Sequence, residues 1–246
     1  MHRLFAAVIF SYLPLRYGLT SSASLIASVA LRWRSGGMVM KRLFLSSILL
    51  LTVMVSPSGS FGADFQKGMD AAQRGDFATA LKEWKPLAEQ GDAPAQYNLG
   101  VMYQEGRGGT QDHKTAVKWY TRAADQGNAS AQNNLGHMHQ NGKGVPQDHA
   151  EAFKWYRLAA NQGVPDAQLN LGVMYGYGYG VKQDYTRALM WWAIAASQGD
   201  ETARKNRDIV EKKMSSADVS KAQKLAREWM KKTKEIEFKW YRLAAD

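Results

Sequence analysis

The chain has 246 residues, 45% of them hydrophobic, no cysteine and a formal net charge of +10. The lack of cysteine excludes disulfides, thiolate nucleophiles, cysteine–zinc sites and a lipidated N-terminal cysteine. The positive charge is concentrated before residue 64 and after residue 202, and the sequence between is near neutral. A broad nucleic-acid-binding face is therefore not expected, because such a face needs basic side chains spread over one surface.

Residues 1–39 form an N-terminal extension without a clear structural signature. Pro14, Arg16 and residues 32–34 (Arg-Trp-Arg) interrupt its apolar runs, and neither run is long enough to cross a membrane. We expect translation to start at Met38 or Met40, with the upstream residues arising from an extended reading of the gene.

Residues 40–63 have the pattern of a secretory signal peptide. Lys41 and Arg42 precede an apolar run over residues 43–55, and residues 60–62 (Ser-Phe-Gly) supply a small-x-small cleavage site. The run is too short to cross a hydrocarbon core of roughly 30 Å comfortably. We expect a periplasmic or secreted protein with no membrane span in the mature chain. The alternative is a short anchor that is not cleaved.

Residues 64–94 predict a pair of helices that caps the N-terminal end of the following array. Their small and aromatic residues have the spacing of a tetratricopeptide unit, with a short turn at residues 74–77.

Residues 95–202 contain a repeat with a step of 36 residues. The hexapeptide Ala-Gln-Tyr-Asn-Leu-Gly at residues 95–100 returns in related form at residues 131–136 and 167–172. Other positions keep the same step: Gly106, Gly142 and Gly178; Gly108, Gly144 and Gly180; Asp112, Asp148 and Asp184; the aromatic pairs Trp119-Tyr120, Trp155-Tyr156 and Trp191-Trp192; Gly91, Gly127, Gly163 and Gly199. We divide the region into units at residues 95–130, 131–166 and 167–202.

Each unit predicts two helices. The first covers about residues 95–103, because its apolar residues recur every three to four positions, and a glycine-rich loop ends it. Asp112, Asp148 and Asp184 are expected to cap the second helix, and Asp148 with Glu151 has the capping-box pattern. Gly127 and its equivalents are expected to end that helix with a positive φ.

The second helix carries the aromatic pair and then two alanines, where neighbouring backbones can approach closely. No single helix pair can bury its own apolar stripe, so the stability of each pair must come from stacking on the next. The sequence therefore predicts an all-α fold, an α-solenoid of helix-turn-helix units.

These recurring residues closely resemble the Sel-1-like repeat, a member of the tetratricopeptide-type α-solenoids. The pattern Leu-Gly-x-x-Tyr, Gly-x-Gly-Val, Asp, Trp-Tyr, Ala-Ala, Gln-Gly is matched in three units that cover residues 95–202. The resemblance implies a right-handed superhelix whose first helices line a concave face. It also implies binding of a protein or an extended peptide.

Residues 203–246 predict a basic helical C-terminal cap and a tail. The stretch to Lys234 has the composition of two polar helices that solubilise the end of the array. The tail at residues 238–245 nearly copies residues 153–160 but lacks a preceding Leu-Gly helix, which is typical of a truncated repeat.

Histidines and glycines around residues 133–149 resemble a metal or phosphate site, but the repeat accounts for them. His137 and His139 are two residues apart on a helix and point about 200° apart, so they cannot chelate one ion. The glycines lie between helices, whereas a phosphate loop follows a strand. We expect no metal and no cofactor, and a polar, pH-sensitive groove contact at His137.

No catalytic pattern is present, since Ser-x-x-Lys, Gly-x-Ser-x-Gly and His-Glu-x-x-His are all missing. We therefore expect a protein that is not an enzyme and acts as an adaptor of the bacterial envelope. The alternatives that the resemblance implies are a β-lactamase or penicillin-binding-like enzyme, as claimed for some cysteine-rich relatives, and a toxin-immunity protein.

Candidate peptide contacts lie on the first helices. An asparagine precedes each Leu-Gly, and a carboxamide can bond the backbone of an extended peptide; the alternative is that it bonds within its own repeat. Positions that differ between repeats are expected to set specificity, with tyrosine a frequent contact residue. The candidates are Asn98, Asn134, Asn170, Tyr97, His137, Gln104, Gln140 and Tyr177.

Overall fold

The computed structural model describes the backbone of residues 58–245 and the side chains of residues 65–235. This part of the chain consists of helices joined by short loops, without a strand. The all-α expectation is confirmed. The expected extension at residues 1–39 and the apolar run of the signal lie outside the described residues. The proposed cleavage site at residues 60–62 falls in the first helix.

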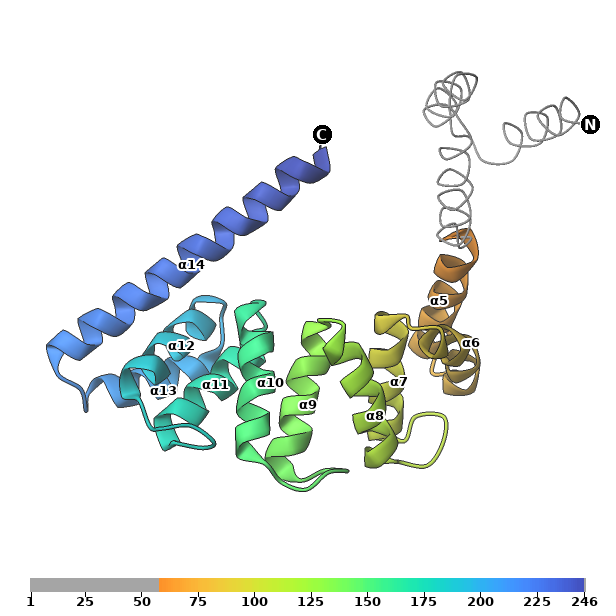
Figure 1. The fold of residues 1–246 in the computed structure, drawn as a ribbon, viewed down its shortest axis with the longest axis horizontal. Coiled ribbons are helices and arrows are strands. Elements are labelled where there is room, and N and C mark those ends of the chain that lie inside the picture. The colour runs from red at the N-terminus through yellow and green to blue at the C-terminus, as the bar shows by residue number, and fades with distance from the viewer. Residues whose placement is uncertain (1–57, 246) are drawn as a thin grey trace, which may run out of the picture. The chain divides into compact units, whose positions relative to one another are not determined.

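The helices follow one another in pairs (Figure 1). The bounds are α5 Ser58–Gln73, α6 Phe77–Glu89, α7 Ala93–Glu105, α8 His113–Asp125, α9 Ala129–Asn141, α10 His149–Asn161, α11 Pro165–Tyr177, α12 Tyr185–Ser197, α13 Glu201–Glu211 and α14 Ser216–Ala245. Within the repeats α7 packs on α8, α9 on α10 and α11 on α12, and α6, α8, α10 and α12 each pack on the helix that follows, as expected for an α-solenoid. The first helix of each repeat starts two residues earlier than the expected residue 95 and its equivalents.

Helix caps follow the expected pattern. Asp112, Asp148 and Asp184 accept hydrogen bonds from backbone N–H groups in the first turn of α8, α10 and α12. The capping box at Asp148 and Glu151 is only half formed, which corrects the expectation. The Asp148 N–H donates to the His139 carbonyl at 2.9 Å, and the Glu151 carboxylate accepts from Lys154 Nζ at 2.6 Å instead.

A glycine in each first helix lets the second helix of the repeat approach closely. A Cβ on Gly100 would stand 2.5 Å from Cδ1 of Tyr120, and Gly136 and Gly172 meet Tyr156 and Trp192 in the same way. The Leu-Gly dipeptide therefore serves two purposes. Its leucine is buried, with Leu99, Leu135 and Leu171 each 1% exposed, and its glycine admits the second ring of the aromatic pair.

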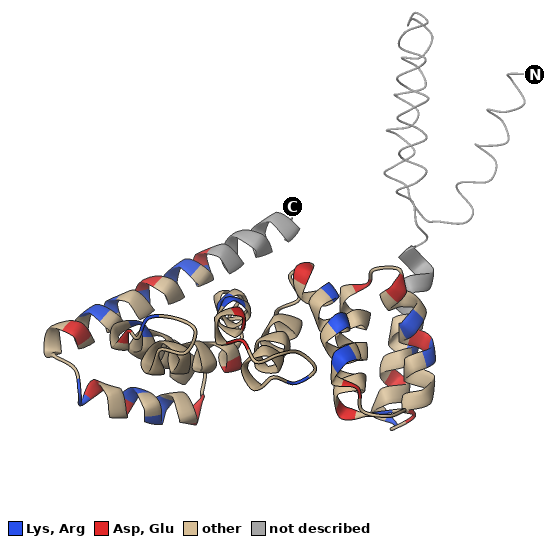
Figure 2. Ribbon diagram, turned by 60° about the horizontal axis from the view of Figure 1, so that its bottom comes forward, with Lys and Arg blue, Asp and Glu red and all other residues tan. Residues whose placement is uncertain are grey.

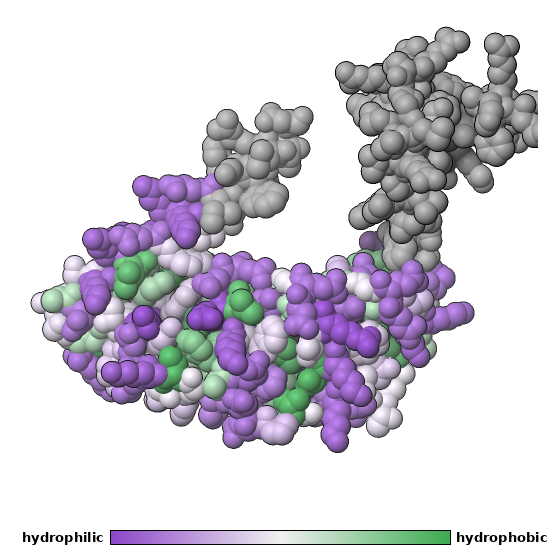
Figure 3. All heavy atoms as spheres, viewed as in Figure 1, coloured by the Kyte–Doolittle hydropathy of each residue, from purple (hydrophilic) through white to green (hydrophobic). Residues whose placement is uncertain are grey.

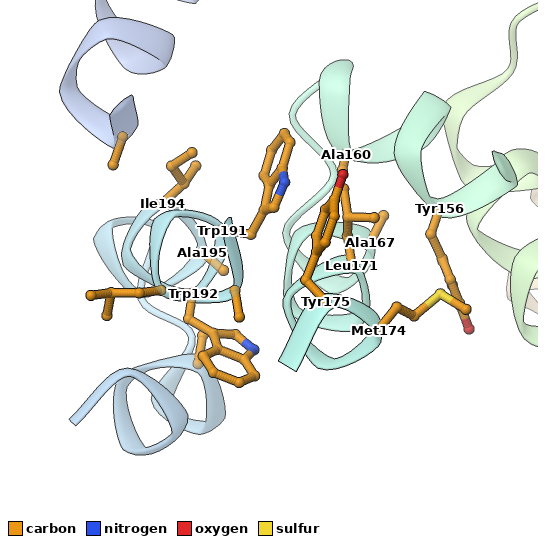
Figure 4. Close-up of a cluster of buried hydrophobic side chains, with 14 of the residues drawn as sticks. Tyr156, Ala160, Ala167, Leu171, Met174, Tyr175, Trp191, Trp192, Ile194 and Ala195 are labelled. Atoms are coloured by element: carbon orange, nitrogen blue, oxygen red, sulfur yellow. The ribbon is translucent and has the colours of Figure 1, made fainter. Parts of the chain in front are cut away.

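The buried side chains form three clusters along the chain. One joins α5, α6 and α7, a second joins α8 and α9, and the third extends from α10 to α14. Figure 4 shows the third cluster, with Trp191 and Trp192 projecting from α12 beside Leu171 and Tyr175 of α11. The core is thus built between neighbouring helix pairs, as the repeat predicts.

The C-terminal cap differs from the repeats before it. Its two expected helices are present, but the second, α14, continues without a break to Ala245, so the repeat-like tail belongs to the same helix. Helix α14 packs on α12, where Trp229 meets Trp191 edge to face at 5.6 Å between ring centroids. Lys and Arg recur along α13 and α14 (Figure 2). The side chains of the tail lie outside the described residues.

Candidate functional site: the first helices and the glycine loops

The predicted asparagines lie half-buried at equivalent places on the first helices. Asn98 Nδ2 approaches Met69 Sδ of α5 at 3.7 Å, and Asn134 of α9 interacts with the Tyr120 hydroxyl of α8. Asn170 occupies the same place on α11. Asn98 and Asn134 thus contact preceding helices of the array. A contact of these asparagines with a peptide stays a prediction.

Gln104 and Gln140 have partners inside their own repeats. The hydroxyl of Tyr120 donates to Gln104 Oε1 at 2.9 Å, and that of Tyr156 donates to Gln140 Oε1 at 2.7 Å. Burial raises the pKa of both tyrosines above the ordinary value, so the two phenols remain neutral donors. In the third repeat both partners change together, to Gly176 and Trp192.

Tyr97 and His137 lie one and two turns into the first helices. The Tyr97 ring is half-buried and tilted against Tyr120, with 6.0 Å between centroids. His137 is exposed. Partial desolvation of its imidazole, together with the nearby ammonium of Lys143, holds the pKa of His137 below its ordinary value.

Each Gly-x-Gly loop connects the two helices of one repeat and contacts the preceding repeat. The first glycine of each pair ends the first helix in the left-handed region, as at Gly142 with φ 65°. The second glycine lies against the carbonyl of the residue that begins the preceding repeat's second helix: Gly108 against Phe77, Gly144 against His113 and Gly180 against His149. A side chain there would collide with backbone. The glycines therefore make a turn and a close contact between repeats.

A row of buried glutamines was not among the sequence candidates. Gln132 Nε2 donates to the Ala124 carbonyl at 3.0 Å, and its Oε1 accepts from Gln162 Nε2 at 2.7 Å. Gln96 and Gln168 repeat the arrangement with Gln126 and Gln198. Both glutamines recur with the 36-residue step, which is the signal that could have found them. Each buried glutamine, near the start of its repeat, thus bonds the end of the preceding repeat and the end of its own repeat.

Tyr177 belongs to an aromatic column, defined here as the rings of His149, Tyr179 and Tyr177. The rings of His149 and Tyr179 stack at 5.2 Å and 20°, and those of Tyr179 and Tyr177 at 5.7 Å and 15°. The column crosses the boundary between two repeats and ends in Tyr177, which is 67% exposed. Of the two tyrosines among the eight candidates, Tyr177 is exposed and Tyr97 is half-buried.

Neither a metal-binding cluster nor a membrane-spanning helix is found among the described residues. In that part of the chain no group of three or more His, Asp or Glu side chains is placed to hold a metal ion. None of its helices combines the length and the apolar character needed to cross a membrane.

Comparisons with known proteins identify the repeat. The model of the Sel1 repeat matches residues 93–128, 129–164, 165–200, 214–235 and 238–246, which together make up more than half of the chain. A search of curated proteins found no match.

Solved structures of the same fold resemble the chain. One is that of c5321, a protective antigen present in uropathogenic Escherichia coli strains that displays an SLR fold. It is 35% identical, with a TM-score of 0.59, over 68% of this chain and 40% of that one. Another is a Sel1 repeat protein from Oxalobacter formigenes, 32% identical, with a TM-score of 0.57, over 59% of this chain and 58% of that one. The chain thus spans about half the length of these relatives.

Proposed function

Because the chain belongs to the Sel1 repeat family, whose repeats generally mediate protein interactions, we propose that it is a non-catalytic adaptor of the bacterial envelope. In this proposal it binds a protein or an extended peptide through the wall formed by the first helices α7, α9 and α11, expected to be the concave face. The observation that carries the proposal is that buried hydrogen bonds join each repeat to the next, while variable side chains remain accessible on that wall.

The buried bonds make the wall a preorganised surface. The glutamine row bonds each first helix to the second helix before it and to the end of the second helix after it, and α7 contacts α9 directly. A preorganised surface loses little conformational entropy on binding, which raises affinity without additional contacts. The face of the molecule seen in Figure 3 mixes apolar areas with polar ones.

Variation along the wall supports recognition of one particular partner. The position of Tyr97 carries Asn133 and Leu169 in the next repeats, and that of Val101 carries His137 and Val173. Since the helix backbones repeat and these side chains do not, the row offers a different contact at each step. This arrangement suits an extended segment that crosses successive repeats.

The envelope location rests on the signal-like residues 40–63. Expression of the full chain followed by N-terminal sequencing of the exported protein tests it. We expect a mature chain that begins near residue 63. An N-terminus before residue 55 would contradict the assignment of a cleaved signal.

An affinity pull-down from the envelope fraction, read by mass spectrometry, tests the wall. We expect a protein partner to be recovered by the unchanged chain and lost with the double variant Asn134→Ala, Asn170→Ala. Lys205→Ala, an exposed change on α13, is the matched control and should recover the same partner. Equal recovery by a folded double variant would remove these asparagines from the binding surface.

A nitrocefin assay on the same protein tests the rival enzyme, and turnover above background would overturn the non-catalytic assignment.

A further inference from the structure

The aromatic column differs from the equivalent places in the other repeats. In the first and third repeats the middle residue of Gly-x-Gly contacts the residue that starts the preceding second helix. In the first repeat this pair is Arg107 and Phe77, with the guanidinium 5.3 Å from the ring centroid. Arg107 also forms an ion pair with Glu105, which is the first-repeat equivalent of Tyr177. At this place in the first repeat, therefore, the outermost residue is the charged Glu105, paired with Arg107.

The third-repeat column ends in a ring instead. Tyr179 replaces the arginine and Tyr177 replaces the glutamate, so the stack runs from half-buried His149 to exposed Tyr177. Tyr177, Tyr179 and Tyr185 account for three of the five exposed large hydrophobic residues among the described side chains, the others being Leu158 and Ile209. Exposed aromatic surface is thus concentrated around one loop, and such concentration marks interaction sites.

The chain itself shows what chemistry its aromatic rings accept. Four rings are covered by arginine guanidinium groups at 4.7 to 5.9 Å from the ring centroid. The pairs are Arg107 with Phe77, Arg122 with Trp119, Arg157 with Phe153 and Arg187 with Tyr175. None of these contacts involves Tyr177, although it is the most exposed of the large hydrophobic side chains described. Its ring stacks on Tyr179, and 67% of the side chain stays exposed, so ring surface remains for a partner.

The charges of the loop do not oppose a cation. Residues 177–185 contain one lysine, Lys182, and one aspartate, Asp184, so the loop is neutral overall. Asp184 is engaged in capping α12 and lies 3.6 Å from Arg187. The contact offered is therefore attraction between a cation and the ring quadrupole rather than an ion pair.

We propose that the exposed ring surface of Tyr177 receives an arginine side chain of the protein partner. This inference rests on the proposed function, because it names a residue type in the partner and the place where it docks. The two stacked tyrosines form a preorganised platform, and their large, stiff side chains lose little entropy on contact. Arginine suits the site because its planar guanidinium is weakly hydrated and stacks on aromatic faces.

The test uses the folded chain and the probe peptide Ac-Gly-Arg-Gly-Arg-Gly-NH2. Its counterpart with citrulline in place of arginine has the same shape without the charge. We expect the ring-proton NMR signals of Tyr177 and Tyr179 to shift with the arginine peptide, with binding weaker by about two- to fivefold for the citrulline peptide. Equal responses to both peptides, or no response of these rings, would overturn the proposal.

Variants separate the ring from the hydroxyl. Tyr177→Phe keeps the ring face and should bind the arginine peptide as the unchanged chain does, while Tyr177→Leu should lose about two- to fivefold in affinity. Ile209→Ala, an exposed hydrophobic residue on α13 and outside this loop, is the matched control and should leave binding unchanged. Weakening by Tyr177→Phe equal to that by Tyr177→Leu would contradict a cation–ring contact.

The pull-down distinguishes the two proposals. If the unchanged chain recovers an envelope partner and folded Tyr177→Leu recovers it equally well, the arginine contact is wrong and the adaptor function stands. If the unchanged chain recovers no partner, the adaptor function itself is wrong.

Discussion

Gly176 lies against the indole of Trp192, and a Cβ on Gly176 would stand 2.9 Å from Trp192 Cη2. In the first two repeats the same two positions hold a hydrogen-bonded pair, Gln104 with Tyr120 and Gln140 with Tyr156. The larger indole fills the space that the glutamine side chain would need. Its Nε1 instead donates to the Leu169 carbonyl at 3.2 Å. The two positions therefore vary as a unit.

A double-mutant cycle measures this coupling. Gly176→Gln alone should destabilise the chain by about 1–3 kcal/mol, because it overpacks the site against Trp192. Trp192→Tyr alone should also destabilise it, because a smaller ring leaves unfilled volume. The double variant restores the pair of the other repeats, so it should be more stable than the sum of the single changes by about 0.5–3 kcal/mol. Urea unfolding gives the three values, and strict additivity would show that the positions are independent.

Removal of one buried glutamine tests the crosslinks between repeats. Gln132→Leu removes the hydrogen bond donated to the Ala124 carbonyl and the one accepted from Gln162, and each such bond contributes about 0.5–1.5 kcal/mol. We expect a lower urea midpoint. Gln90→Leu changes an exposed glutamine at the end of α6 and should alter stability by no more than about 0.5 kcal/mol. Equal effects of the two changes would refute the structural role of the buried row.

Acid should weaken the second helices through their caps. Hydrogen bonds from the Thr115 side chain and backbone lower the pKa of Asp112, and that from the Glu151 backbone lowers the pKa of Asp148. A lowered pKa in the folded state means that the stabilisation is complete above the ordinary value of 3.8 and is lost as the pH falls through the folded-state value.

Thermal melts followed by circular dichroism between pH 7 and pH 2 measure the loss. Asparagine caps a helix without titrating, so the double variant Asp112→Asn, Asp148→Asn should lose less stability on acidification than the unchanged chain. An identical acid response would assign the loss to other carboxylates.

Trp229 should hold α14 on the array. Its ring meets Trp191 edge to face, and such a pair contributes about 0.5–1.5 kcal/mol beyond the apolar area that it buries. Trp229→Ala is expected to accelerate proteolytic cleavage within residues 216–235 while leaving the repeats intact. Trp229→Phe is the conservative control and should protect the helix better than alanine. Cleavage that begins in residues 93–200 would contradict this local effect.

Much of the fold follows from local signals in the sequence. The 36-residue step, the capping aspartates and the glycines at helix ends predict the helix pairs, because each signal acts within a few residues of the backbone that it shapes. The burial of Leu99 and its equivalents follows from the same periodicity. The use of the first helices as a binding wall stays a prediction.

The partners of the polar side chains needed the tertiary structure. Gln104 and Gln140 were expected in a groove, whereas each accepts a bond from a tyrosine sixteen residues away in its own repeat. The glutamine row joins residues thirty apart, and His149 meets Tyr179 from the next repeat. A helix periodicity says which side of a helix is buried, but it does not say which neighbour a side chain reaches.

The sequence by itself therefore determined the repeat, the helices and their buried faces. Only the tertiary structure decided that α14 packs on α12 and that Tyr177 ends an open aromatic column. The physical reason is the range of the interactions. Caps and turns depend on neighbours along the chain. Ring stacking and hydrogen bonds between repeats depend on the distance and angle at which two separate helices pack.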